Sequence, residues 1–128
     1  MDRTQLIVVD AANVVGSKPD GWWRDRAGAA RRLLLQISTL TEQPGDIVVV
    51  LEGAAKAAIT SETPETDVLR VVSADGNGDD AIVEVVATAR KADDRRAVLV
   101  ITADRGLRAR VEALGATTAG PRWLLDRF

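Results

Sequence analysis

Short runs of aliphatic, largely β-branched residues recur along this chain, and they constrain its fold more than any other feature. Charged residues or turn formers bound each run, which is typical of a strand in the interior of a sheet. The chain has four such runs, which are Leu6–Val9, Ile47–Leu51, Val68–Val72 and Val98–Ile101. A shorter edge strand is expected at Ala116–Thr118.

The segments between these runs predict helices. From about Asp25 to Thr41, apolar residues follow the three-and-four spacing of an amphipathic helix. A second helix is expected to open at Asp79 and Asp80, and a third to follow Asp104 and stop at Gly115.

The remaining segments are less regular. A cluster of turn formers that includes Pro19 predicts a loop from Ala11 to Trp23, and Pro44–Asp46 is expected to end the first helix. One or two helical turns are expected over Ala54–Ile59, and a final turn or helix around Trp123.

Strands that alternate with helices in this way predict an α/β fold with a mainly parallel, doubly wound sheet and right-handed crossovers. A length of 128 residues suits one sheet covered by helices, so we expect a single domain over 1–128. The apolar runs are far shorter than the ~20 residues that cross a bilayer. With no visible signal peptide, we expect a cytoplasmic protein with no membrane partner.

The sequence contains no Cys and no His, and this removes whole classes of chemistry. Cys-His and Ser-His-Asp catalysis, thiolate zinc sites and disulfide frameworks are all excluded. Any metal site must be built from carboxylate and amide oxygens, which suit hard cations such as Mg²⁺, Mn²⁺ or Ca²⁺. The net charge of −2 also argues against strong general affinity for nucleic acid, so RNA binding must be local.

Acidic residues stand where the predicted strands end. Asp10 and Glu52 directly follow two strands, Asp104 follows a third, and Asp79 and Asp80 open the helix after another. In a parallel sheet these positions share one rim, where such folds bind ligands.

Converging carboxylates repel one another, and a divalent cation is the simplest way to neutralise them. We therefore expect Mg²⁺ or Mn²⁺ at this rim. Glu84 lies one turn after Asp80 on the same helical face and is a further candidate ligand. Each strand-end Asp has an ordinary alternative role as the cap of the next helix.

Three segments resemble the acidic motifs of the PIN-like/NYN nucleases. They are Asp10–Gly16 (DAANVVG), Gly78–Glu84 (GDDAIVE) and Thr102–Leu107 (TADRGL). The loop from Gly16 to Arg24 also looks like the corresponding segment of short actinobacterial NYN-like proteins.

The resemblance implies a three-layer α/β/α PIN-like domain with strand order 3-2-1-4-5, which would place the first and fourth strands side by side. It implies a metal-dependent ribonuclease in which Asp10, Asp80 and Asp104 bind metal and Asn13 orients the substrate. The chain lacks the extra acid that PIN toxins usually carry on an early helix, which favours the NYN type. Glu52 or Glu84 would then have to supply the second metal position.

Further residues are candidates for contact with RNA. Trp22 and Trp23 can stack on unpaired bases, although packing of the loop onto the first helix is the alternative for one of them. Arg105 and Arg108 follow Asp104 at a helix start, where phosphate or ordinary ion pairing would suit them. The candidate substrate-binding residues are Asn13, Thr102, Arg105, Arg108, Trp22, Trp23 and Arg24.

Other functions fit parts of the sequence. Gly76–Ala81 matches a loose dinucleotide-binding pattern, but two acids at that helix start would repel a pyrophosphate. A response-regulator phosphoacceptor normally needs a Lys after a late strand, and none follows Asp104. A non-catalytic RNA- or protein-binding relative and a nucleotide pyrophosphohydrolase using the same metal site stay open, as does a homodimer.

Overall fold

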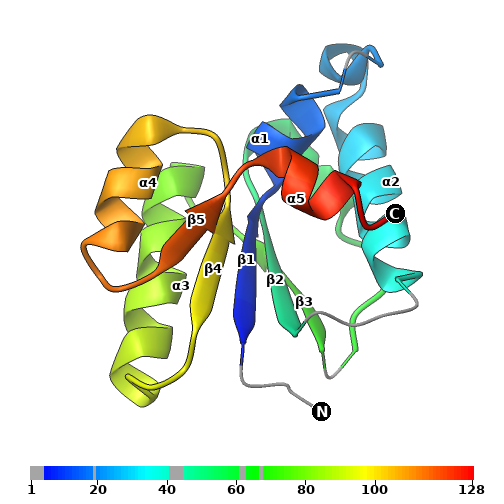
Figure 1. Ribbon diagram of the computed structural model, residues 1–128. Coiled ribbons are helices and arrows are strands. Elements are labelled where there is room, and N and C mark those ends of the chain that lie inside the picture. Colours follow the sequence, from blue (N-terminus) through cyan, green and yellow to red (C-terminus); the bar gives the residue numbers. More distant parts are fainter. Residues whose placement is uncertain (1–4, 19, 41–44, 61–62, 67) are drawn as a thin grey trace.

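Five parallel strands form one sheet at the centre of the computed structural model, which describes residues 5–18, 20–40, 45–60, 63–66 and 68–128. The strand order is β3-β2-β1-β4-β5, as the resemblance to PIN-like nucleases implies (Figure 1). The strands are β1 (Leu6–Asp10), β2 (Asp46–Leu51), β3 (Leu69–Ser73), β4 (Val98–Ile101) and β5 (Thr117–Ala119).

Helices cover both faces of the sheet, which gives the expected three layers. In Figure 1, α1, α2 and α5 lie on one side of the strands, and α3 and α4 lie on the other. The α-helices are α1 (Ala11–Gly16), α2 (Arg26–Ser38), α3 (Gly78–Ala92), α4 (Arg105–Glu112) and α5 (Pro121–Leu125), and the short 3₁₀ helices are η1 (Trp22–Arg24) and η2 (Gly53–Ala58). No helix in the described part of the chain is long and apolar enough to cross a bilayer.

The central strands are aliphatic throughout because alternate side chains enter two separate cores. In β1, Ile7 and Val9 pack toward α1 and α2, whereas Leu6 and Val8 pack toward α3 and α4. All four side chains are buried. A strand with a core on each side cannot show the polar alternation of a half-exposed strand, which explains the continuous apolar runs.

One segment differs from its expectation. The sequence predicts a loop from Ala11 to Trp23, but α1 forms at once after β1 and η1 begins at Trp22. The helix begins where the Asp10 carboxylate accepts a hydrogen bond from the backbone N–H of Asn13, and it buries Val14 against the core. A helix of six residues is too short to show a clear period in the sequence. Three residues used in those expectations, Pro19, Thr41 and Pro44, lie outside the described residues.

The strand register brings the ends of β1 and β4 together. Val9 pairs with Ile101, so Asp10 lies beside Thr102 at the carboxyl rim. On its other side, Asp10 pairs with Val50 of β2, two residues before Glu52. Side chains separated by about ninety residues in the chain thereby become neighbours, as the 92-residue separation of Asp10 and Thr102 illustrates.

Candidate active site

Asp10 lies at the centre of the carboxyl rim and is buried, with only 6% of its surface exposed. Its Oδ2 accepts a hydrogen bond from the Thr102 hydroxyl at 2.9 Å, and its Oδ1 accepts one from the Asn13 backbone N–H at 3.3 Å. Burial raises the pKa of Asp10 to about 6, even though both hydrogen bonds lower it. The charges of Asp79 and Glu52 raise the pKa further. The Asp10 carboxyl therefore lies near other acidic side chains, whose charges make its ionisation less favourable.

Thr102 connects the two strand-end aspartates. While its hydroxyl donates to Asp10, its oxygen accepts a hydrogen bond from the Asp104 backbone N–H at 3.1 Å. Thr102 is fully buried and both functions of its hydroxyl are engaged. Thr102 is expected from the sequence to bind substrate, and in the structure its side chain has no exposed surface. It instead positions Asp10 and the turn that carries Asp104.

Asp104 caps α4 and also faces the site. Its Oδ1 accepts a hydrogen bond from the Leu107 backbone N–H at 3.0 Å, so the capping alternative holds for this residue. The residue is nevertheless exposed, and its charge raises the pKa of Asp79 on the neighbouring helix α3. Asp104 therefore caps α4 and also lies near enough to Asp79 for the two charges to interact.

Glu52 reaches across the rim from the end of β2 to the start of α3. Its Oε2 accepts a hydrogen bond from the Gly78 backbone N–H at 3.1 Å. The approach is close enough that a Cβ on Gly78 would lie 2.6 Å from Oε1 of Glu52. Because glycine has no Cβ, the first position of α3 allows the Glu52 carboxylate to lie this close to the start of the helix.

The two aspartates that open α3 point in different directions. Asp79 is half-buried, and burial raises its pKa, with further upward contributions from Asp104 and Glu52. Asp80 is exposed and pairs with Arg110 of α4 at 3.0 Å. Of the two, Asp79 is the one whose pKa is raised by the charges of Asp104 and Glu52.

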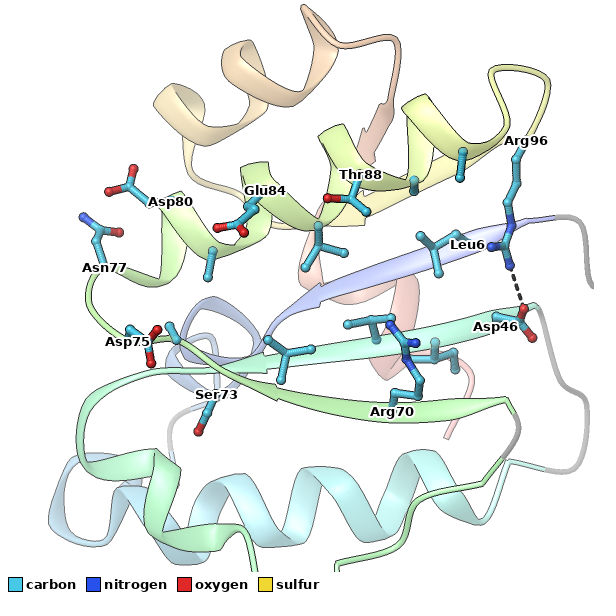
Figure 2. Close-up of a pocket in the computed structure, with 18 of the residues that line it drawn as sticks. Leu6, Asp46, Arg70, Ser73, Asp75, Asn77, Asp80, Glu84, Thr88 and Arg96 are labelled. Carbon is cyan, nitrogen blue, oxygen red and sulfur yellow. Dashed lines mark hydrogen bonds and ion pairs between the residues drawn. The ribbon is translucent and has the colours of Figure 1, made fainter.

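Asp80 and Glu84 instead line a separate groove, which is drawn in Figure 2. The groove encloses about 740 Å³ between α3 and the strands β2 and β3, with Arg70 among the residues that line it. Glu84 is exposed there, one turn beyond Asp80. The expectation that Glu84 reaches the same centre as Asp10 is not met, because α3 presents this side chain to the groove.

Asn13 fastens α1 to the loop after β4. Its side-chain Oδ1 accepts a hydrogen bond from the Ala103 backbone N–H at 2.8 Å. This contact occupies the amide oxygen and leaves the amide nitrogen as the donor of the group. Asn13 also lines an open groove between α1 and α5 in which Lys18 and Arg122 lie. Both cations are ion-paired at the surface, Lys18 with Asp20 at 3.9 Å and Arg122 with Asp126 at 3.0 Å.

We define the acidic group as Asp10, Glu52, Asp79 and Asp104. Among the described residues, no three acidic side chains converge closely enough to form a ready-made metal site. The donor set nevertheless suits a hard divalent cation, because it consists of carboxylate oxygens alone. The raised pKa of Asp10 reports unfavourable burial and repulsion, which a cation would relieve. The residues therefore fit Mg²⁺ or Mn²⁺ chemically, and binding would require their side chains to draw together.

The other residues expected to contact RNA fall into two sets. Trp22 is half-buried against the core. Trp23 is 55% exposed, and the guanidinium carbon of Arg24 lies 5.9 Å from the centre of its ring. Arg105 is exposed in the first turn of α4. Arg108 is half-buried, and its Nε donates to the Thr102 carbonyl oxygen at 2.9 Å. Arg108 therefore holds the end of β4 in place.

Sequence reasoning missed two features of the rim. Arg26 lies over the Trp22 ring at 5.3 Å, and both line a cavity beside Glu52. Lys18 and Arg122 come from distant segments and meet only in the groove beside Asn13. No sequence signal could pair residues that far apart, although the cationic character of each was visible.

Comparison with known proteins identifies the fold. No protein-family model and no curated protein matches the sequence. Among solved structures, a mutant of Rae1 (YacP) from Bacillus subtilis matches 94% of this chain and 72% of its own, with a TM-score of 0.70 at 16% identity. Rae1 without that mutation matches 98% of this chain and 72% of its own, with a TM-score of 0.68 at 16% identity. The chain therefore has the PIN-like three-layer α/β/α fold.

Proposed function

We propose that this protein is a metal-dependent ribonuclease that hydrolyses RNA phosphodiester bonds at the acidic group. The proposal is supported by three motifs that resemble those of PIN-like/NYN nucleases and by the PIN-like fold. One observation carries it. Burial, with smaller contributions from the charges of Asp79 and Glu52, raises the pKa of Asp10 to about 6 even though the carboxylate caps α1, and a divalent cation would offset this unfavourable burial of charge.

Asp10, Glu52, Asp79 and Asp104 are the residues that would hold Mg²⁺ or Mn²⁺. A cation there would polarise a phosphoryl oxygen and make water a stronger nucleophile. The resemblance assigns the α3 position to Asp80, and we propose Asp79 instead, since Asp79 is the member of the pair whose pKa responds to Asp104 and Glu52.

The surrounding residues act by positioning. Thr102 holds the Asp10 carboxylate through its hydroxyl, and Asn13 holds the loop that carries Asp104. The amide nitrogen of Asn13 remains as the donor of the group and would donate to a phosphate oxygen of the bound RNA. A rigid arrangement of this kind matters because a small displacement of a charged group at a reacting centre costs much of its effect.

RNA is the proposed partner, and its binding must be local because the chain carries a net charge of −2. The exposed Arg105 after Asp104 could contact a phosphate near the acidic group. Lys18 and Arg122, in the groove beside Asn13, could do so by exchanging their surface ion pairs with Asp20 and Asp126 for a phosphate. These contacts would fix the strand, while the acids act on one phosphodiester. A cytoplasmic location and a homodimer stay predictions.

The test is cleavage of labelled single-stranded and structured RNA with Mg²⁺, with Mn²⁺ and with EDTA, beside the Asp104→Asn variant. We expect cuts that require metal and are lost in the variant. Cuts that persist in EDTA, or that the variant makes at the wild-type rate, would contradict the proposal.

A nucleoside triphosphate in the same assay separates the alternatives. Turnover of the triphosphate alone would favour a nucleotide pyrophosphohydrolase. RNA binding without cleavage, in the presence of either metal, would favour a non-catalytic RNA-binding protein.

A further inference from the structure

A small cavity lies next to the acidic group, on the side of the sheet covered by α1 and α2. It encloses about 260 Å³. Its residues come from four elements that meet at the carboxyl rim, and all are described. The lining residues are Ala11, Ala12, Val15, Trp22, Arg26, Ala30, Glu52, Gly53 and Ala55.

The lining of this cavity is mostly small and apolar, with one aromatic wall. Alanine, glycine and valine supply most of the surface, so the space exists because the side chains are short. Trp22 is held in place on one side, since it packs against the core and its ring lies 3.7 Å from where a Cβ of Gly16 would be. Arg26 lies over one face of the same ring at 5.3 Å, which is too close to hold a base between the two, so a base that stacks on Trp22 would take the place of this guanidinium on the ring. An aromatic wall and a guanidinium group suit a flat, polarisable ligand.

The size of the cavity limits the ligand. Pockets for drug-sized molecules start at about 300 Å³, so this cavity suits a single planar ring system. An unpaired nucleobase has that size and shape, and proteins that read single-stranded RNA stack such bases on aromatic side chains and arginine.

Glu52 belongs to both the cavity and the acidic group. The residue lines the cavity, while Oε2 of its carboxylate accepts a hydrogen bond from the Gly78 backbone N–H at 3.1 Å and its charge raises the pKa of Asp10. A ligand that fills the cavity is therefore within reach of the group that would act on a phosphate. A nucleotide carries both a flat base and a phosphate, so one RNA strand could place a base in the cavity and a phosphate at the acidic group.

Taking the proposed function as its premise, we propose that this cavity is a subsite for one unpaired, amino-bearing base of the RNA strand, stacked on Trp22 and hydrogen-bonded to Glu52. A carboxylate only accepts hydrogen bonds, so it favours the amino groups of adenine, cytosine and guanine. Uracil offers the carboxylate only N3–H, which is flanked by two carbonyl oxygens that the carboxylate would repel. The subsite would thus disfavour uracil at one position beside the cleaved bond.

The experiment measures binding of AMP, CMP, GMP and UMP to the full chain by saturation-transfer-difference NMR, with EDTA present. Binding without metal keeps the readout independent of catalysis. We expect transfer to the base protons of AMP, CMP and GMP, with UMP bound on the order of tenfold more weakly. Equal binding of all four, or no binding of any at millimolar concentration, would overturn the proposal.

Two substitutions on η2 form a matched pair. Ala55→Leu puts a larger side chain into the cavity, whereas Ala57→Leu makes the same change at an exposed position outside the lining. We expect Ala55→Leu to abolish mononucleotide binding and to raise KM for RNA, and Ala57→Leu to do neither. Unchanged binding in Ala55→Leu would refute the assignment. Should Ala55→Leu not fold, Ala12→Leu fills the same cavity from α1, at an exposed position.

The two proposals can fail separately. If mononucleotides bind in the cavity but no RNA is cut, the base subsite stands and the nuclease activity fails. If RNA is cut with metal but Ala55→Leu and Ala12→Leu both cleave with unchanged KM, the nuclease stands and the subsite fails.

Discussion

The Thr102 hydroxyl donates a hydrogen bond to Oδ2 of Asp10 at 2.9 Å, although 92 residues separate the two in the chain. The same oxygen accepts from the backbone N–H of Asp104 at 3.1 Å. One buried hydroxyl thus fixes the relative position of two strand-end aspartates. Several predictions about the site depend on this link and on the acids around it.

The first prediction concerns the hydroxyl itself. Thr102→Val removes the donor while keeping the shape of the side chain, so the Asp10 pKa should rise above its present value of about 6. A larger fraction of Asp10 would then be protonated at neutral pH, and metal-dependent cleavage should fall. In a plot of cleavage rate against pH, the loss of activity on the acidic side should move to higher pH. An NMR titration of the Asp10 carboxyl carbon without metal measures the pKa directly.

Thr102→Ser is the matched control, because it keeps the hydroxyl and should leave the Asp10 pKa at about 6. The valine variant should also lose about 1–3 kcal/mol of stability, since a buried acceptor and the Asp104 N–H lose their partner. A valine variant with an unchanged Asp10 titration would contradict the role assigned to Thr102.

The second prediction is that Asp10 destabilises the metal-free protein at neutral pH. Its folded pKa of about 6 lies above the model value of 3.8, so the folded state holds this proton more tightly than the unfolded state. Stability from this group is full below pH 3.8 and falls as pH rises toward 6. A difference of about two pKa units corresponds to ~3 kcal/mol, an upper figure.

Asp10→Asn should therefore raise the free energy of unfolding at pH 7.5 in EDTA by about 1–3 kcal/mol while abolishing cleavage. The gain should shrink as the pH is lowered toward 4, where Asp10 is protonated in the folded protein. Urea unfolding at both pH values measures it. A variant that is less stable than the parent at pH 7.5 would show that repulsion at Asp10 is already relieved.

The third prediction separates the adjacent aspartates of α3. Asp79→Asn removes the residue whose pKa responds to Asp104 and Glu52, and we expect cleavage to fall by roughly tenfold to a hundredfold, as for lost groups around a metal site. Asp80→Asn removes an exposed partner of Arg110 and should keep activity within about threefold, because surface ion pairs contribute little. Initial rates at saturating Mn²⁺ measure both.

A reversed order, with Asp80→Asn inactive and Asp79→Asn active, would return the α3 position to the residue that the resemblance assigns. Arg110→Gln provides a further comparison, since it breaks the same ion pair without removing a carboxylate.

The fourth prediction uses Gly78. In Gly78→Ala the new Cβ would lie 2.6 Å from Oε1 of Glu52, so the carboxylate must move out of the acidic group. Cleavage should fall, while α3 should persist because alanine is a better helix former than glycine. Circular dichroism and thermal unfolding would report the fold, and the Mn²⁺ concentration needed for half-maximal cleavage would rise.

The metal itself gives the last prediction. Mg²⁺ or Mn²⁺ should raise the melting temperature of the wild type, since a ligand that binds only the folded state stabilises it. The increase should be largely absent in Asp10→Asn. An identical shift in both proteins would place metal binding away from the acidic group.

Much of the architecture could be predicted from the sequence. The aliphatic runs specify strands with a core on each face, because no other element hides every side chain of so short a run. Placement of the acids after these runs also predicts a shared rim, since parallel strands end at the same edge. The exception was α1, because a helix of six residues is too short to show a periodic pattern of apolar residues in the sequence.

The tertiary structure alone decided which acids meet. Asp79 and Asp80 are neighbours in sequence, but successive helical residues point about 100° apart, so the docking of α3 on the sheet leaves Asp79 half-buried near Asp104 and Glu52 and leaves Asp80 exposed in an ion pair with Arg110. The fully buried position of Thr102 and the cavity beside Glu52 likewise depend on how distant elements pack. The sequence by itself determined the layers, the rim and the kind of chemistry available there, because these follow from residue type and local period. Orientation at the rim follows from packing between elements, which no local pattern encodes.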